Sequence, residues 1–386
     1  MQTVLTAERL WDGTGLLDHP LVAIEDGRIA SISTRSRSPL SGAARILDFP
    51  GATLAPAFFD AHIHGANGHD TMEATPEAID AIAAFLAAHG TANFLPTTVT
   101  APLDATLRAL AGLAKLLARP PAEGRAHPLG IHLEGPFLSH EKRGVQPEED
   151  LLLPDTATFD RLFEAAEGRV RLMTLAPELP GAAELVAHAS ARGVRISLGH
   201  SNARAAEARA ALNAGAVSAT HTFNAMRSLD HREPGILGVA LTSDALFAEI
   251  ICDGIHTAPE MVRLWWRAKG PERALLVTDA ISAAGMPDGA YHLGGFVVQV
   301  AGGRAMARGV LAGSVLTLDR ALANLIEFTG APLEEALRSL TVNPAAMTGF
   351  DDQAGRLAVG RPASLVAVDR SGRLLASFIH GKAAAS

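Results

Sequence analysis

Histidine and carboxylate side chains recur along the chain at spacings that could bind a divalent cation. His62 and His64 are separated by one residue, so in an extended segment both imidazoles point to the same side of the strand. Single candidate donors follow later apolar runs, namely Glu134, His200, His221 and Asp279. Imidazole nitrogens and carboxylate oxygens are donors that Zn²⁺ and similar divalent ions accept. A lone His-x-His is a weak signal, because many such pairs are merely surface or core histidines.

The apolar runs that precede these donors predict the strands of a barrel. Helical patterns, such as those of residues 76–89, 104–118 and 205–213, lie between most of the runs. This alternation predicts an α/β fold with a (β/α)8 TIM-like barrel, in which loops at the C-terminal ends of the strands build the active site. Four histidines and two carboxylates then fall at the same end of the predicted strands, which argues against an accidental match. The eight predicted strands are residues 54–59, 92–95, 130–133, 170–175, 194–198, 217–220, 247–252 and 274–277.

Both ends of the chain have the pattern of β structure rather than of barrel elements. Asp26 and Gly27 separate two short apolar runs, which is a hairpin signal, and residues 363–379 show a similar pattern. Neither end alone could easily bury one face of a sheet. We therefore predict a small β-sandwich domain formed by residues 1–53 and 357–386, with the (β/α)8 barrel of residues 54–356 and its candidate metal donors inserted between them.

The composition indicates a soluble globular protein with a substantial core. The 386 residues are 48% apolar and 19% charged, and the formal charge of −8 argues against a general affinity for nucleic acid or an anionic membrane surface. The single cysteine, Cys252, excludes an intrachain disulfide and is compatible with a reducing compartment. No signal peptide and no apolar run of about 18 residues is recognisable, so the expected location is cytoplasmic, without a membrane partner.

Eight short motifs together carry a family resemblance. They are residues 59–65 (FDAHIHG), 132–137 (HLEGPF), 198–203 (LGHSNA), 220–226 (THTFNAM), 232–235 (REPG), 253–256 (DGIH), 276–280 (LVTDA) and 311–314 (LAGS). The set resembles the N-acetylglucosamine-6-phosphate deacetylase family, within the amidohydrolase superfamily. The resemblance runs from about residue 54 to residue 369 and is far more specific than any one motif.

This resemblance implies a metal centre and a proton-transfer residue. Glu134, His200 and His221 are expected to hold the main metal, while His62 and His64 belong to a second metal position. Some members of the family lack this His pair and work with one ion. One or two divalent ions per subunit are therefore expected, Zn²⁺ first, with Fe²⁺, Co²⁺ or Mn²⁺ as alternatives. Asp279 is implied as the general base and then the general acid, although taken alone it could be a helix N-cap.

The resemblance also implies how a phosphorylated sugar is bound. Asn224, Ala225 and His256 are expected near the phosphate. Arg232 is expected to reach in from a neighbouring subunit, which implies a homodimer with a shared active site. Taken alone, Arg232 would be interpreted as a surface partner of an acidic neighbour, Glu233 or Asp230.

One position departs from the family pattern. The family usually carries a histidine shortly after the Glu-Gly-Pro segment, and Gln146 stands there instead. A glutamine amide can donate a hydrogen bond but cannot take up a proton as an imidazole does. Either Gln146 suffices to orient the acetamide, or nearby His140 substitutes for the missing histidine, or the substrate differs from the usual one.

The expected activity is metal-dependent hydrolysis of the acetamide of N-acetylglucosamine 6-phosphate to glucosamine 6-phosphate and acetate. One alternative is deacetylation of a related N-acyl amino sugar, such as N-acetylgalactosamine 6-phosphate. A second is a non-catalytic barrel scaffold, which would be expected to have lost its metal ligands. The remaining histidines are interpreted as structural, except that His69 lies close to a motif and His132 could support Glu134 from behind.

Overall fold

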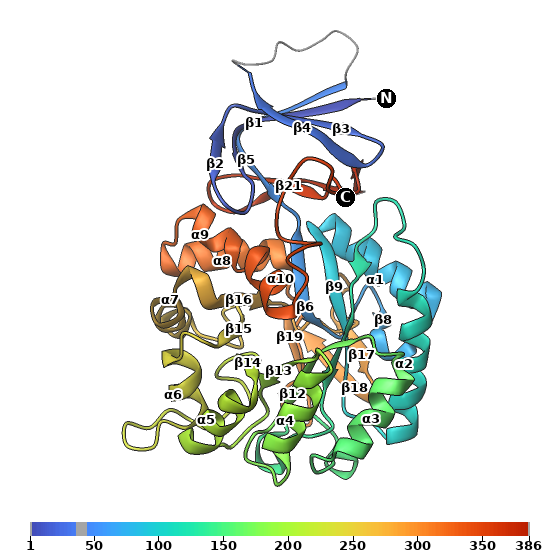
Figure 1. Ribbon diagram of the computed structural model, residues 1–386, viewed down its shortest axis with the longest axis vertical. Coiled ribbons are helices and arrows are strands. Elements are labelled where there is room, and N and C mark those ends of the chain that lie inside the picture. The colour runs from blue at the N-terminus through green and yellow to red at the C-terminus, as the bar shows by residue number, and fades with distance from the viewer. Residues whose placement is uncertain (1, 36–44, 385–386) are drawn as a thin grey trace.

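The computed structural model describes residues 2–35 and 45–384, and it shows a barrel with a sheet at one of its ends (Figure 1). Residues 1, 36–44, 385 and 386 belong to the two predicted terminal segments and lie outside the described residues. No helix in the described ranges is long and apolar enough to cross a membrane.

Eight parallel strands form the barrel, in the order of the chain. Neighbouring strands pair in parallel from the first to the last. The last strand meets the first through the segment just after β16, where the Asp279 N–H donates to the carbonyl of His62 in β6 at 2.9 Å. The predicted barrel is therefore confirmed. Its strands are β6 (Phe58–Ile63), β9 (Thr91–Thr98), β11 (Ile131–Glu134), β12 (Val170–Leu175), β13 (Arg195–Leu198), β14 (Ala216–Ala219), β15 (Phe247–Ile251) and β16 (Ala274–Val277).

Helices cover the outside of the barrel. On α1, Ile79, Ile82 and Leu86 are buried at the three- and four-residue spacing of one helix face, and the Thr75 hydroxyl accepts the Ala78 N–H at its start. Three short 3₁₀ helices are η1 (Thr71–Glu73), η2 (His140–Lys142) and η3 (Glu148–Asp150). The α-helices are α1 (Pro76–Ala88), α2 (Leu103–Leu117), α3 (Thr156–Ala165), α4 (Ala182–Ala191), α5 (Ala205–Ala214), α6 (Gly235–Thr242), α7 (Pro259–Arg273), α8 (Leu318–Thr329), α9 (Leu333–Arg338) and α10 (Val342–Thr348).

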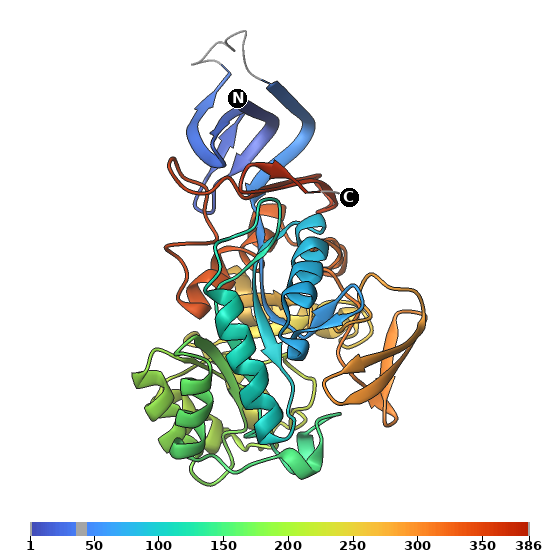
Figure 2. The ribbon, with the colours of Figure 1, turned by 90° about the vertical axis from the view of Figure 1, so that its right-hand side faces the viewer.

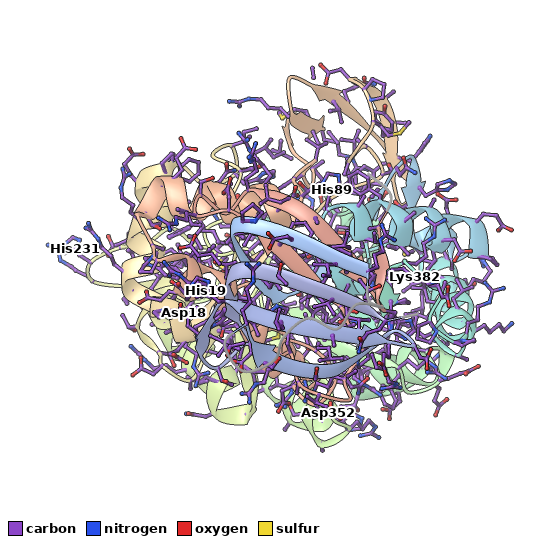
Figure 3. All side chains as sticks on the ribbon, turned by 90° about the horizontal axis from the view of Figure 1, so that it is seen from above. Asp18, His19, His89, His231, Asp352 and Lys382 are labelled. Carbon is purple, nitrogen blue, oxygen red and sulfur yellow. The ribbon has the colours of Figure 1, made fainter. Side chains whose placement is uncertain are left out.

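The two ends of the chain, which were expected to form one small β-sandwich domain, pair into one continuous sheet. β5 joins them, because it runs parallel to β1 and antiparallel to β21. Seen from above, this terminal sheet lies over the barrel (Figure 3). The expected Asp26-Gly27 turn connects β3 to β4. The strands are β1 (Thr3–Trp11), β2 (Leu16–Asp18), β3 (Pro20–Glu25), β4 (Arg28–Thr34), β5 (Arg45–Pro56), β21 (Leu365–Val368), β22 (Leu374–Ile379) and β23 (Lys382–Ala383).

The predicted first barrel strand, residues 54–59, is misplaced. Residues 54–56 end β5 and pair with β21 of the terminal sheet, and the barrel strand β6 begins at Phe58. Both strands are buried here, so the apolar run continues across the junction between two sheets. Hydrophobicity alone could not show where one sheet ends and the next begins.

A four-stranded antiparallel sheet, which the sequence analysis did not predict, lies between β16 and α8. It consists of β17 (Gly289–Leu293), β18 (Phe296–Ala301), β19 (Arg304–Ala307) and β20 (Val310–Leu311), and it projects from the side of the barrel (Figure 2). Its inner face packs against Val99, Val145 and Ile281, next to barrel strand ends. Three two-residue strands complete the described structure: β7 (Gly65–Ala66), β8 (His69–Asp70) and β10 (His127–Pro128).

Candidate active site

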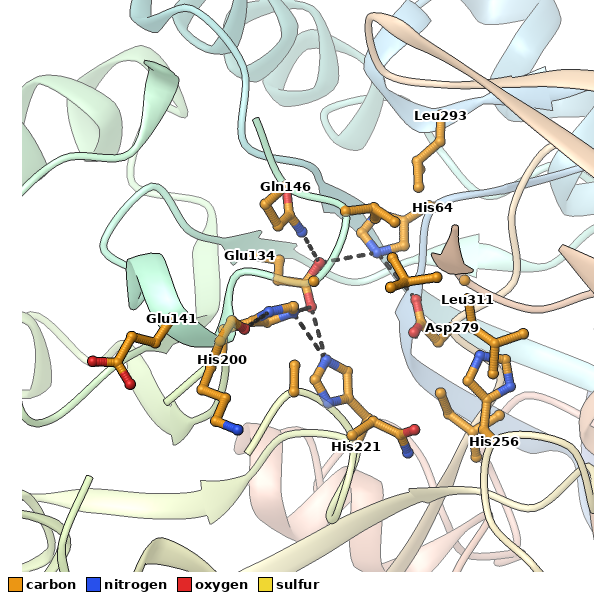
Figure 4. A pocket seen from close by; sticks show the side chains of 18 residues that line it. His64, Glu134, Glu141, Gln146, His200, His221, His256, Asp279, Leu293 and Leu311 are labelled. Carbon is orange, nitrogen blue, oxygen red and sulfur yellow. Dashed lines mark hydrogen bonds and ion pairs between the residues drawn. The ribbon is translucent and has the colours of Figure 1, made fainter. Parts of the chain in front are cut away.

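The six side chains predicted as ligands and acid–base group converge at the C-terminal ends of the barrel strands. Figure 4 shows five of them around one pocket. They form two sets, in each of which the donor atoms lie within 4.8 Å of one another. The first set is Glu134, His200 and His221, and the second is His62, His64 and Asp279.

Glu134 lies between the two sets. Its Oε1 is 3.1 Å from His200 Nε2 and 3.2 Å from His221 Nε2. Its Oε2 is 3.2 Å from His64 Nε2, which also lies 3.2 Å from Asp279 Oδ1. Oε1 also lies 3.4 Å from His62 Nε2, so the Glu134 carboxylate contacts histidines of both sets.

The backbone at the strand ends turns these side chains inward. His200, His221 and Asp279 each follow a barrel strand closely, and their φ angles are 46°, 28° and 49°. Such left-handed conformations cost a non-glycine residue about 1–3 kcal/mol and persist where the surrounding structure enforces them. Three strained residues in one cluster mark a place that the fold maintains at the expense of stability.

Opposite charges in the cluster oppose the effect of burial on each pKa. Burial alone would lower the pKa of His62, but Glu134 and Asp279 outweigh it and raise this pKa to about 9. The same two carboxylates raise the pKa of His64 to about 10 against its burial. Burial would raise the pKa of Asp279, but the charges of His62 and His64 lower it below its ordinary value. The raised pKa values of both histidines indicate that the surrounding carboxylates favour a positive charge at this place.

The donor set fits a divalent cation. The His200 Nδ1–H donates to the Lys142 carbonyl at 3.0 Å, which leaves the Nε2 lone pair free to face Glu134 and His221. Nδ1 of His64 and Nδ1 of His221 are buried without a hydrogen-bond partner among residues 2–35 and 45–384. Nitrogen and carboxylate oxygen donors in sets of three are typical of catalytic Zn²⁺ and related ions.

A cavity of about 330 Å³ opens onto this cluster. This volume lies within the usual range of about 300–1,000 Å³ for small-molecule sites. Asn224, Ala225 and His256, which were predicted near the substrate phosphate, line the same cavity as Asp279. The His256 Nδ1–H donates to Asp253 Oδ2 at 2.7 Å, which fixes the orientation of the imidazole.

Both polar ends of the Gln146 side chain are used within the protein. Its Oε1 accepts the Thr100 backbone N–H, and its Nε2 donates to Glu134 Oε2, each at 2.9 Å. The Thr100 N–H needs an acceptor and the Glu134 carboxylate needs a donor, so these partners define which way the amide points. Gln146 therefore orients Glu134, and one N–H of its amide remains for a substrate.

Two predicted substrate residues lie away from the cavity. The His140 side chain is exposed, and its Nδ1 lies 3.5 Å from Glu148 Oε1. His140 does not line the cavity. Arg232 is exposed on the loop after β14. Its neighbour His231 lies at the periphery of the molecule (Figure 3). The Arg232 guanidinium has no ion-pair partner in the described part of the chain, so the alternative pairing with Glu233 or Asp230 is absent there.

The sequence analysis missed one group under the cluster, Glu249 on β15. This carboxylate is fully buried, and its Oε2 lies 3.5 Å from His62 Nδ1. A single charged residue in the apolar run FAEIIC was the available signal. His132 is buried against His62, with ring centroids 4.6 Å apart, and its Nε2 contacts the Thr174 hydroxyl at 2.9 Å rather than the cavity.

The barrel and its cluster of imidazoles and carboxylates define a class of hydrolase, and comparison with known proteins specifies the family. A family model described as "Amidohydrolase family" matches residues 53–384, and the chain belongs to this family. The chain is 39% identical, over the full length of both proteins, to N-acetylgalactosamine-6-phosphate deacetylase of Escherichia coli O157:H7. It is 36% identical to N-acetylglucosamine-6-phosphate deacetylase of Bacillus subtilis (strain 168), covering 94% of this chain and 92% of that protein.

A solved structure agrees with these relatives. A mutant of N-acetyl-D-glucosamine-6-phosphate deacetylase from Mycobacterium smegmatis, in complex with N-acetyl-D-glucosamine 6-phosphate, superposes with a TM-score of 0.92. That protein is 35% identical, and the match covers 100% of both chains. The family predicted from the eight motifs is therefore confirmed.

Proposed function

We propose that the chain hydrolyses the acetamide of N-acetylglucosamine 6-phosphate to glucosamine 6-phosphate and acetate. One observation carries the proposal: five of the six cluster side chains line the same cavity as three residues predicted near the phosphate. The five are His64, Glu134, His200, His221 and Asp279, and the three are Asn224, Ala225 and His256. The names of the relatives supply the substrate class. A non-catalytic scaffold is disfavoured, because the complete ligand set and the acid–base group are present and converge.

Glu134, His200 and His221 would hold one divalent ion, and His62, His64 and Asp279 would provide the second position. We propose Zn²⁺ first, with Fe²⁺, Co²⁺ or Mn²⁺ as alternatives that these donors also accept. A bound divalent ion would lower the pKa of a water molecule to about 7 and polarise the acetamide carbonyl. Its binding is favoured by the carboxylates that raise the pKa values of His62 and His64.

Asp279 would move the proton during the reaction. Its carboxylate is ionised, because the neighbouring imidazoles lower its pKa, so it can accept the proton of the attacking water. As the C–N bond breaks, the same carboxyl group returns that proton to the sugar nitrogen, because a deprotonated amine is too poor a leaving group. The water oxygen and its second proton remain on the acetyl carbon as acetic acid, whose proton passes to the amine, and the products are acetate and the ammonium form of the amino sugar.

The sugar phosphate would lie near Asn224, Ala225 and His256, which line the cavity. Asn224 Nδ2 is buried without a hydrogen-bond partner in the described ranges, so it is available to a ligand oxygen. His256, held by Asp253, and the segment at Ala225 line the same cavity. We further propose a homodimer in which the exposed Arg232 reaches the neighbouring active site. A cytoplasmic location remains a prediction from the sequence.

The galactosamine epimer is a second candidate substrate. It is favoured by the 39% identity over both full lengths to a deacetylase named for N-acetylgalactosamine 6-phosphate. The position of Gln146, where the family usually has a histidine, also bears on substrate recognition because its amide lies in the cavity wall.

An acetate-release assay on four compounds tests the proposal. The metal-replete protein is supplied with N-acetylglucosamine and N-acetylgalactosamine, each with and without the 6-phosphate. We expect the highest kcat/KM on a 6-phosphate and a large loss without phosphate. Higher kcat/KM on the galactosamine 6-phosphate would replace the first candidate with the second. Acetate release from neither phosphate would refute both.

A further inference from the structure

A buried carboxylate that the proposed reaction does not use lies directly beneath the second donor set. Glu249 is on β15, and its side chain is 0% exposed. Its Oε2 lies 3.5 Å from His62 Nδ1 and accepts the His221 backbone N–H at 3.3 Å, while Oε1 has no hydrogen-bond partner in the described ranges. A buried carboxylate is costly without a partner of opposite charge or a donor, and in the described residues its ion-pair partner is His62.

This contact determines which nitrogen of His62 can bind an ion. Glu249 Oε2 accepts the His221 N–H and so faces His62 as an acceptor, and the imidazole supplies the N–H from Nδ1. In the neutral imidazole the lone pair is then on Nε2, which lies 3.2 Å from His64 Nε2 and 3.6 Å from Asp279 Oδ1. A carboxylate behind a ligating histidine also increases the basicity of the imidazole and fixes its orientation.

The other three histidines of the cluster are supported differently. Nδ1 of His200 donates to a neutral backbone carbonyl, that of Lys142, and Nδ1 of His64 and of His221 have no described partner. Among these four histidines, in the described residues, a carboxylate faces Nδ1 of His62 alone. Because His62 belongs to the second donor set, we expect this carboxylate to affect that set.

We infer that Glu249 is a positioning residue that holds His62 ready for an ion, and thereby sets the affinity of the second donor set. This inference rests on the proposed function, because it requires that the second set binds a divalent cation. Glu249 touches neither the cavity nor a reacting atom, so its effect passes through His62.

Replacing Glu249 with glutamine tests the inference, because the amide has nearly the same shape. The glutamine oxygen at the Oε2 position can still accept both the His221 N–H and the His62 Nδ1–H, but the side chain carries no negative charge. Without that charge behind it, His62 should be a less basic ligand. We expect the second ion to bind about 10–100-fold more weakly, as is typical when such a support is removed, with the first ion unchanged.

The readout is stepwise Co²⁺ titration of chelator-treated protein, followed by visible absorption and elemental analysis. The matched control is Glu178→Gln, which makes the same replacement behind the other donor set. Glu178 accepts the Ser201 hydroxyl at 2.7 Å and the Asn202 N–H at 2.6 Å, next to His200. This control should leave the second Co²⁺ affinity at the parent value.

The outcomes separate this inference from the proposal on which it rests. A parent protein that binds one Co²⁺ per chain would overturn both the two-ion site and the role of Glu249. A parent with two ions and a Glu249→Gln variant with unchanged affinities would overturn the role of Glu249 alone, as would equal weakening of both ions. If the glutamine variant does not fold, Glu249→Asp, which keeps the charge on a shorter side chain, should weaken the second ion alone.

Discussion

Histidines at the two ends of the barrel experience opposite electrostatic environments. At the C-terminal end, carboxylates raise the pKa of His62 to about 9 and that of His64 to about 10. At the other end, beneath the terminal sheet, burial and the nearby His380 lower the pKa of His127 to about 4. Burial and Arg28 likewise lower the pKa of His380. Burial alone favours the neutral imidazole, and only surrounding carboxylates reverse it.

This difference separates a site built for a cation from a place where histidines merely pack. His127 and His380 line a cavity of about 390 Å³ together with Arg28 and Arg361, whose positive charges disfavour a metal ion. A strongly shifted pKa by itself would not have distinguished the two ends. The direction of the pKa shift and the group that causes it distinguish the two ends.

The largest effect is expected at the end with the carboxylates. Asp279→Asn removes the proton-transfer group but keeps a side chain of similar shape, so kcat should fall about 10²–10⁴-fold. Steady-state acetate release measures the loss. Asp352→Asn, an exposed replacement at the opposite end, serves as the control and should keep the parent rate. Turnover of Asp279→Asn at the parent rate would exclude the acid–base role.

A smaller effect is expected at Gln146. Gln146→Leu leaves the buried Thr100 N–H and one oxygen of Glu134 without their partners, so the free energy of unfolding should fall by about 1–3 kcal/mol. Because Glu134 loses its support, metal affinity should also fall about 10–100-fold. Urea denaturation and metal titration measure the two effects. Unchanged metal affinity in the folded variant would show that Gln146 does not position Glu134.

The smallest effect is expected at His127, and it concerns stability alone. The folded pKa of about 4 lies below the ordinary value of 6.5, so the unfolded chain binds a proton more readily between these values. Stability is therefore lost as the pH falls from about 6.5 to about 4. His127→Gln removes this titration and should reduce the acid-induced loss by about 1–2 kcal/mol, allowing for partial solvent screening.

Urea denaturation of the parent and of His127→Gln between pH 7 and pH 4 measures this difference. Acetate release should be unchanged at pH 7, because His127 lies at the end of the barrel away from Asp279. Equal acid sensitivity of the two proteins would contradict the assigned environment of His127.

The repeating strands of the barrel could be predicted from the sequence. Seven of the eight predicted barrel strands overlap their observed positions closely, because each is a short apolar run bounded by loops. The exception is β6, where the apolar run continues from β5 of another sheet. The sheet from β17 to β20 was missed, because alternating short strands inside a βα connection have no barrel periodicity.

At the site, the donors could be predicted but their supports could not. His62 and Glu134 lie in the last residues of β6 and β11, and His200 and Asp279 come just after β13 and β16, so the barrel topology brings them together. The contacts of Gln146 with Glu134 and of Glu249 with His62 depend on side-chain directions at positions 12 and 187 residues apart in sequence. The proposed role of Arg232 requires a neighbouring subunit, which one chain's sequence does not describe.

The central claim is that the cluster of six side chains holds the ion required for deacetylation. The most direct measurement is the rate of acetate release from N-acetylglucosamine 6-phosphate or its galactosamine epimer as a function of bound metal per chain, in chelator-treated and reconstituted protein. The rate should be near zero without metal and rise in proportion to occupancy until the sites are filled. Full activity on either sugar phosphate in metal-free protein would contradict the claim.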